Sequence, residues 1–135
     1  MGGKGLSVSV WTSDQAFSWY NEQGWLVGCN FLPSSCINQI EMFQEDTFNI
    51  EEITKEVSWA KDIGFNTLRV YLHDLLWKEK DQFLVRFNDF LDCCKRFEIK
   101  PIIVLFDDCH YPFPQLGPQP LPVRGIHNSG WKQSP

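Results

Sequence analysis

The fold of this chain is decided by the stretch GFNTLRVYLHD, residues 64–74. Gly64 can adopt the left-handed conformation that ends a helix, and Asn66 and Thr67 lead directly into a strand. The following side chains alternate with the period of two typical of a strand, so that one face carries Leu68, Val70 and Leu72 and the other carries Arg69, Tyr71 and His73. A half-exposed surface strand would also alternate, but helical patterns before and after this stretch favour a parallel sheet. Inside such a sheet an arginine needs hydrogen-bonding or anionic partners, because an unpaired buried charge is very unfavourable.

Two other apolar runs predict strands, which gives three strands near residues 25–31, 67–73 and 101–107. Gly28 in the first run is expected to allow close approach of a neighbouring strand. The third run is apolar on both faces, which is typical of a buried strand. The sequence therefore predicts an α/β fold with parallel strands.

Helices are predicted between these strands, near residues 50–63 and 82–97, with Asn49 and Asp81 as their N-terminal caps. Glu52 is expected to reach back to the cap of the first of them. A capping-box pattern at residues 12–15 predicts a further short helix at the N-terminus. The apolar stripe of the second helix, which we expect to join the core, consists of Phe83, Phe87, Phe90, Leu91, Cys94 and Phe97.

These elements form one domain, which we divide into three parts. Residues 1–24 form an N-terminal capping region, residues 25–110 contain the three strands and two helices, and residues 111–135 form a long loop rich in proline and glycine. Residues 32–48 and 75–80 are expected to be connections without regular structure.

Composition narrows the possible partners. The 135 residues include 17 Asp plus Glu against 12 Lys plus Arg and no basic run, which argues against nucleic acid and anionic membranes as partners. No apolar run is long enough to span a membrane. The N-terminus has no signal-peptide pattern, which fits the cytoplasm or a leader that has been removed. Five cysteines without a Cys-x-x-Cys motif indicate neither a disulfide framework nor a zinc site, and we expect no cofactor.

Polar residues follow all three predicted strands at their carboxyl ends. The first strand ends at Asn30, the second at His73 and Asp74, and the third runs into Asp107, Asp108 and His110. No Gly-rich phosphate loop follows the first strand, which argues against a dinucleotide-binding sheet. Active sites of (β/α)8 barrels lie at this edge of the strands. The spacing of the strands predicts about three of the eight βα units of a TIM barrel.

The stretch GFNTLRV, residues 64–70, resembles the second-strand motif of retaining glycoside hydrolases of the cellulase family 5 type. The segments WLVGCNFLPS at residues 25–34, INQIEM at 37–42 and HNSGW at 127–131 are similar to a cellulase-like group labelled as 1,4-β-xylanase. The resemblance covers about residues 15–135. It implies the N-terminal portion of a TIM-barrel enzyme that hydrolyses O-glycosyl bonds in a β-linked glycan.

The same resemblance implies that Arg69 supports the catalytic nucleophile. The family often carries Asp-x-His or Asn-x-His after the third strand, which matches Asp108 and His110, although Asp107 could be the aligned residue. The family's two catalytic glutamates follow the fourth and seventh strands, which this chain does not contain. Retaining chemistry needs both carboxylates, so we expect the isolated chain to be inactive on glycosides.

The candidate substrate-binding residues are Asn30, Glu41, Arg69, His73, Trp77, Asp107, Asp108, His110 and Trp131. Their expected partner is an oligosaccharide or polysaccharide. Two alternatives stay open: a metal-dependent barrel hydrolase that uses His73, Asp108 and His110, and a non-catalytic carbohydrate-binding fragment. Uncovered sheet edges would also allow self-association of the isolated chain.

Overall fold

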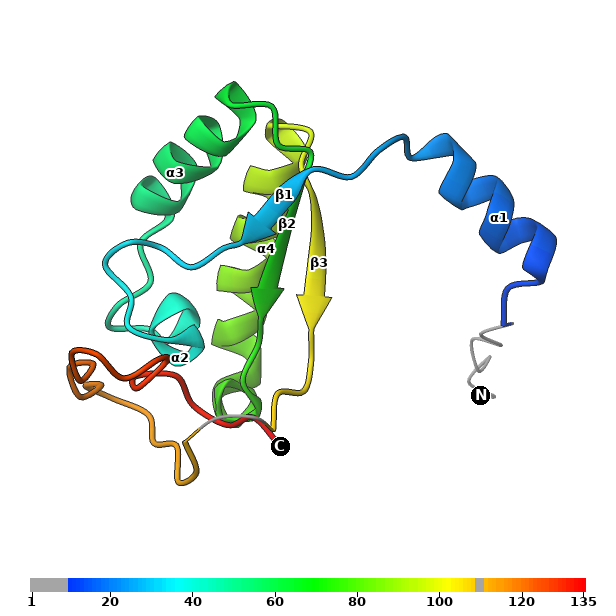
Figure 1. The fold of residues 1–135 in the computed structure, drawn as a ribbon. Helices are drawn as coiled ribbons and strands as arrows, with labels where there is room; N and C mark the ends of the chain where they lie inside the picture. Colours follow the sequence, from blue (N-terminus) through cyan, green and yellow to red (C-terminus); the bar gives the residue numbers. More distant parts are fainter. Residues whose placement is uncertain (1–9, 109–110) are drawn as a thin grey trace, which may run out of the picture.

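The computed structural model describes residues 10–108 and 111–135 of the chain. The elements follow the order α1 (Ser13–Glu22), β1 (Gly28–Asn30), α2 (Gln39–Phe43), α3 (Ile50–Asp62), β2 (Thr67–Tyr71), the 3-10 helix η1 (Asp74–Glu79), α4 (Lys80–Arg96) and β3 (Lys100–Val104) (Figure 1). Residues 111–135 contain no helix and no strand longer than an isolated bridge.

The three strands form one parallel sheet in the order β1-β2-β3, as predicted. The register places Asn30 beside Arg69, and Arg69 beside Ile102. The predicted close approach at Gly28 is confirmed, because a Cβ atom there would lie 1.8 Å from the Thr67 carbonyl oxygen. All three strands are shorter than predicted, and the backbone after Val104 leaves the sheet.

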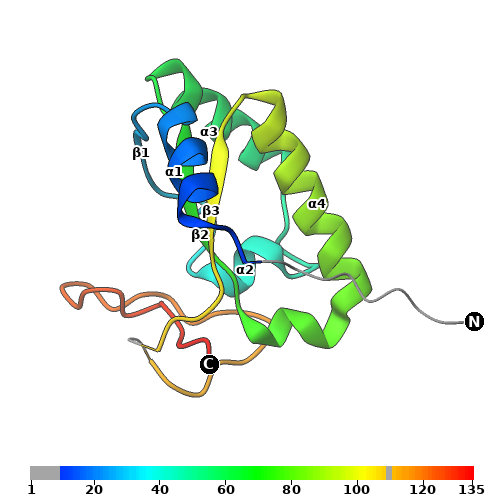
Figure 2. The ribbon, with the colours of Figure 1, turned by 90° about the vertical axis from the view of Figure 1, so that its right-hand side faces the viewer.

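Helices α3 and α4 cover one face of this sheet, and the core lies between the two layers (Figures 1 and 2). Leu68 and Val70 of β2 are fully buried against Val57 of α3 and Phe90 of α4. Complete burial of such side chains contributes roughly 1.5–3 kcal/mol each. The apolar face expected for the strand in residues 67–73 is therefore confirmed at Leu68 and Val70.

Several predicted helix ends are confirmed. Thr12 and Gln15 form the capping box of α1, and the Asn49 side chain accepts hydrogen bonds at the start of α3. Gly64 has a φ of +93°, the left-handed conformation expected after α3. The prediction for Glu52 is wrong, because its carboxylate accepts hydrogen bonds from the hydroxyls of the loop residues Ser34 and Ser35.

Two short helices were not predicted. Helix α2 lies in the expected connection 32–48, and its five residues are too few to show a helical period. Its Phe43 is buried and packs edge-on against Phe83 and Phe90, with ring centroids 5.8 Å apart. Helix η1 replaces the expected connection 75–80 and runs directly into α4, so Asp81 lies inside that helix and does not cap it.

The other face of the sheet is not covered by the described residues. Ile102 of β3 is 46% exposed, so the expectation of a third strand buried on both faces is wrong for this chain. Helix α1 buries none of its residues and stands apart from the sheet (Figure 1). The N-terminal helix therefore caps nothing in the described part of the structure.

Candidate functional site

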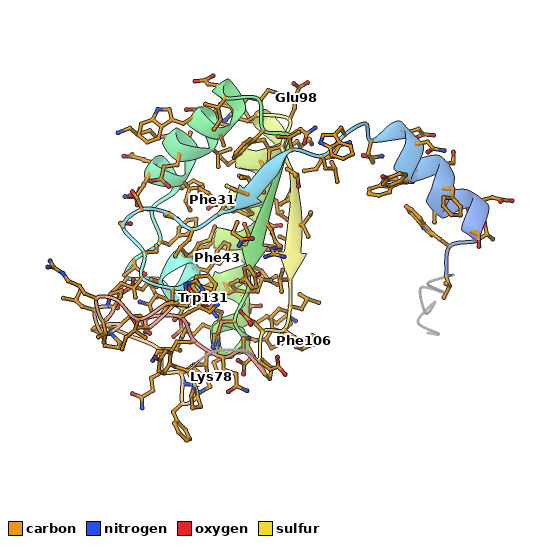
Figure 3. All side chains as sticks on the ribbon, in the orientation of Figure 1. Phe31, Phe43, Lys78, Glu98, Phe106 and Trp131 are labelled. Carbon is orange, nitrogen blue, oxygen red and sulfur yellow. The ribbon has the colours of Figure 1, made fainter. Side chains whose placement is uncertain are left out.

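A pocket of about 210 Å³ lies at the carboxyl ends of the strands. Its lining residues come from the ends of β1 and β2, the segment after β3 and the C-terminal loop, and they are Asn30, Phe31, Leu32, Tyr71, Asp107, Asn128 and Trp131. In Figure 3 Trp131 lies toward the end of the sheet to which the strand arrows point, and Glu98 lies at the opposite end. The structure thus brings three of the predicted site residues together, namely Asn30, Asp107 and Trp131.

Contacts with Asp107 and Tyr71 orient the Trp131 indole. Its Nε1–H donates a hydrogen bond of 2.9 Å to Oδ2 of Asp107. Its ring packs edge-to-face with Tyr71, with centroids 5.5 Å apart and planes at 89°. Edge-to-face contacts of this kind favour one orientation of the ring. The pocket therefore combines aromatic surface with an amide and a carboxylate, a mixture typical of small-ligand sites.

Arg69 lies beside this pocket on the uncovered face of the sheet. Its Nε–H donates a hydrogen bond of 2.7 Å to Oδ1 of Asn30, and its guanidinium lies over the Tyr71 ring at 5.3 Å from the centroid. Arg69 is exposed, so the burial expected for this arginine is wrong for this chain, but its side chain does have a hydrogen-bonding partner in the Asn30 amide. Asn30 also lines a second hollow, of about 350 Å³, together with Arg69 and Ile102. Asn30 thus connects the pocket with the arginine.

His73 is not on a strand, because β2 ends at Tyr71. Its side chain is buried: Nδ1 accepts a 3.1 Å hydrogen bond from the Leu75 amide, and Nε2 lies 2.8 Å from the Gln133 carbonyl oxygen. The neutral tautomer with the proton on Nε2 satisfies both contacts. Burial lowers the His73 pKa below its ordinary value of 6.5, and this effect outweighs the opposing influence of the Gln133 carbonyl and of Asp74. The ring does not line the pocket.

Two other candidates also lie outside the pocket. Glu41, expected on a loop, is a buried residue of α2, and its Oε2 accepts a 2.6 Å hydrogen bond from the Ile37 amide. Trp77 belongs to η1, is 56% exposed and packs against Phe83. The structure thus gives Glu41 a structural contact and separates Trp77 from the other aromatic candidate.

No metal site is assembled among the described members of the set proposed for one. Both ring nitrogens of His73 have partners, Asp108 is exposed and does not line the pocket, and His110 lies outside the described residues. Within residues 10–108 and 111–135, no group of three or more His, Cys, Asp or Glu side chains could hold a metal ion.

Four pocket residues were not among the sequence candidates: Phe31, Leu32, Tyr71 and Asn128. Asn128 has a φ of +51°, and its carbonyl accepts a 2.9 Å hydrogen bond from the Trp131 amide. This turn carries Trp131 back over the strand ends. The Asn-Ser-Gly sequence at residues 128–130 is a turn signal that could have pointed to it.

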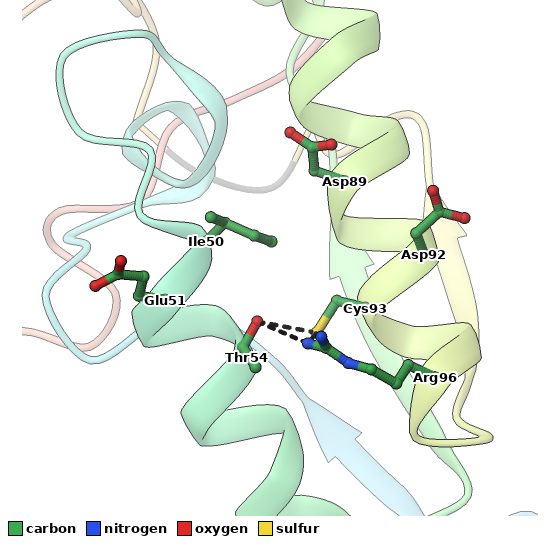
Figure 4. A pocket seen from close by; sticks show the side chains of 7 residues that line it. All are labelled: Ile50, Glu51, Thr54, Asp89, Asp92, Cys93 and Arg96. Atoms are coloured by element: carbon green, nitrogen blue, oxygen red, sulfur yellow. Dashed lines mark hydrogen bonds between the residues drawn. The ribbon is translucent and has the colours of Figure 1, made fainter.

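A larger groove, of about 720 Å³, lies between α3 and α4 (Figure 4). It is lined by Ile50, Glu51, Thr54, Asp89, Asp92, Cys93 and Arg96. Arg96 donates a hydrogen bond of 3.1 Å to the Thr54 hydroxyl. This groove lies in the helical layer, away from the strand ends, and contains none of the residues that the sequence singled out. The smaller pocket is therefore the candidate site.

Comparisons with protein-family models, with curated proteins and with solved structures found no match to this chain. Across the described part of the chain, none of the helices combines the length and the apolar character needed to cross a bilayer.

Proposed function

We propose that the chain forms the first three βα units of a (β/α)8 barrel and belongs to a retaining glycoside hydrolase that acts on a β-linked glycan. The observation that carries this proposal is the meeting of Asn30, Asp107 and Trp131 at the carboxyl edge of a parallel sheet. Barrel enzymes place their active sites at this edge. The sequence resemblance of the second strand supplies the choice of chemistry.

The pocket suits a single sugar ring. Its volume of about 210 Å³ lies below the range of about 300–1,000 Å³ that is common for drug-sized ligands. The Trp131 and Tyr71 rings supply apolar surface for the C–H groups of a sugar, while the Asn30 amide and the Asp107 carboxylate are polar groups of the kind that bind hydroxyls. Because the Asp107–Trp131 hydrogen bond joins one polar and one aromatic group, both are held ready before the ligand arrives.

Arg69 is the residue that we assign to the chemistry. In a retaining enzyme one carboxylate attacks the sugar and a second acts as acid and base, with the two about 5–5.5 Å apart. We propose that both of these catalytic carboxylates come from strands outside this chain. A guanidinium beside the nucleophile would keep it ionised and oriented, and the Asn30 hydrogen bond holds Arg69 toward the strand ends.

A non-catalytic carbohydrate-binding role is the second candidate. It is favoured by one observation: the residues that line the pocket include a single carboxylate, Asp107, whereas the retaining mechanism uses two. Binding without turnover by the 135-residue chain is expected under both proposals. Turnover by a longer form with additional strands would distinguish the enzyme from the binding fragment.

The first prediction concerns binding in the pocket. Trp131→Ala should weaken the binding of xylo- or cello-oligosaccharides by roughly 2- to 10-fold, because one aromatic contact contributes about 0.5–1.5 kcal/mol. Isothermal titration calorimetry or saturation-transfer NMR would measure this. Trp77→Ala is the matched control, since Trp77 is an exposed tryptophan outside the pocket. Equal losses in both variants, or no binding of any oligosaccharide by the unmodified chain, would contradict the proposal.

A further inference from the structure

The C-terminal loop, which lines the pocket with Asn128 and Trp131, is attached to the strand ends by hydrogen bonds of Ser134. The backbone of Ser134 donates to and accepts from the backbone of Asp107, over 2.7 Å and 2.6 Å. The Ser134 hydroxyl accepts a hydrogen bond of 3.1 Å from the Asp74 amide. Ser134 is 1% exposed, so this contact is well inside the protein. The residue that it holds, Asp107, is the same one that orients Trp131.

Side chains from two other parts of the chain also form hydrogen bonds with the backbone of residues 130–133. At the start of α2, the capping residue Asn38 donates to the Gly130 carbonyl and Gln39 donates to the Lys132 carbonyl. Before η1, His73 contacts the Gln133 carbonyl through Nε2. The α2 contacts are made by neutral amides, which do not titrate. Of the three side chains that contact the backbone of residues 130–133 here, His73 is therefore the one whose ordinary pKa lies close to neutral pH.

We propose that His73 is a positioning residue for the pocket. The neutral ring holds the segment Trp131–Ser134 against the strand ends, and protonation of the ring releases Gln133 and Ser134. The use of the pocket as a binding site rests on the proposed function. The reason lies in the surroundings of the ring. A proton on Nδ1 would face the Leu75 amide, which now donates to that atom, and a charged ring would be buried. In the released segment the ring would be hydrated and free to take up the proton.

The nearest charged group opposes this effect without cancelling it. Oδ1 of Asp74 lies 3.0 Å from Nδ1 of His73 and favours the protonated ring. Burial is nevertheless the larger influence and lowers the His73 pKa. Helices α2 and α4 pack against η1, and the C-terminal segment covers its start. The other charged or titratable residues of α2, η1 and the first two turns of α4 are Glu41, Lys78, Glu79, Lys80, Asp81 and Arg86. Around Gln133 and Ser134 they are Asp107, Tyr111 and Lys132.

The direction of the pH effect follows from the linkage between proton binding at His73 and release of the segment. Because the closed segment holds His73 with the lower pKa, acid favours the released state below about pH 6.5, by up to tenfold per pH unit until the buried ring is protonated as well. Ordinary carboxylates titrate near pH 4 and therefore contribute little between pH 7.5 and 5, and the histidine variants described below separate His73 from the other histidines of the chain.

The test is hydrogen–deuterium exchange of the Ser134 and Gln133 amides, which donate to Asp107 and Tyr111, followed from pH 7.5 to 5 and corrected for intrinsic exchange rates. We expect their protection to fall several-fold below pH 6.5 while the core amide of Val70 keeps its protection. His73→Gln should remove this pH dependence, since the glutamine amide can still donate to Gln133 but cannot titrate. His127→Gln, which changes an exposed histidine of the same loop, should retain it.

Protection that does not change with pH, or that changes equally in His73→Gln and His127→Gln, would overturn the role of His73. An NMR titration of the unmodified chain gives the same answer if the His73→Gln variant does not fold. The Ser134 amide signal should then titrate together with the His73 ring, and an independent midpoint would contradict the proposal. None of these readouts needs a sugar, so a failure of glycan binding and a failure of the His73 role are distinguishable.

Discussion

At the scale of single residues, the site depends on side chains that hold one another. Arg69 binds Asn30, and Asp107 binds Trp131, so each candidate ligand contact has a partner within the protein. Such contacts fix the geometry before a ligand arrives and reduce the entropy lost on binding. The Asn30–Arg69 contact links the pocket with the group that we assign to the chemistry.

The prediction for Arg69 belongs to this scale. If the proposed function is right, Arg69→Ala in a longer form that carries both carboxylates of the retaining mechanism should lower kcat by about 10²–10³-fold, a size typical of removing one preorganised electrostatic contact. Folding should be retained, because Arg69 lies on the uncovered face of the sheet. Steady-state kinetics and circular dichroism would measure the two effects. Arg96→Ala is the matched control, since Arg96 lies in the groove between α3 and α4, and near-normal turnover of Arg69→Ala would refute the assignment.

At the scale of elements, the two long helices and β2 carry the core, and α1 contributes nothing to it. Helix α1 has a complete capping box yet buries no residue. Isolated helices of this length are marginal in water, because most helical stability comes from packing of an apolar face. The exposed aromatic residues Phe17, Trp19 and Tyr20 show that this packing is not made by the described residues.

Disruption of α1 by Ser18→Pro, in the middle of this helix, should therefore leave the stability of the rest of the chain nearly unchanged. The expected difference in the free energy of unfolding is below about 0.5 kcal/mol, as for surface changes away from packed features. Urea unfolding followed by near-UV circular dichroism would measure it. A loss of several kcal/mol would mean that α1 packs on the sheet in solution.

The elements also show what the sequence can predict. The alternation in residues 67–71 and the aromatic stripe of α4 place the sheet and its helical cover correctly, because burial on one face produces a period that is visible over several residues. Helix α2 and η1 escaped prediction because each is held by contacts with distant residues. Asn38 of the α2 cap binds Gly130, and His73 at the start of η1 lies against Gln133.

Part of the candidate site could be predicted from the sequence, and the part that depends on contacts between distant residues could not. Asn30 and Asp107 follow strands, and parallel strands bring their ends to one edge, so their meeting could be expected from topology. The burial of Glu41 and His73 depends on how the loop 111–135 folds back over α2 and η1, and this loop has no regular period. The local sequence pattern around Glu41 and His73 therefore could not predict that these two side chains are buried.

At the scale of the whole molecule, the structure is one-sided. Among the described residues, helices cover one face of the sheet, while the other face carries the exposed Ile102, and the segment after β3 carries the exposed Phe106. An uncovered parallel sheet is unusual, since such sheets are covered on both faces in complete domains. This asymmetry supports the proposal that the sheet is part of a barrel. Self-association through this face and the edge strands stays a prediction.

The most direct measurement maps a ligand on the isotopically labelled chain by NMR. Titration with a xylo- or cello-oligosaccharide should shift the Trp131 indole Nε1–H signal and the side-chain amides of Asn30 and Asn128, since all three residues line the pocket at the strand ends. Signals from Thr54 and Arg96, in the groove between α3 and α4, should stay in place. Shifts confined to that groove, or no shift with any β-linked oligosaccharide, would contradict a glycan site at the strand ends.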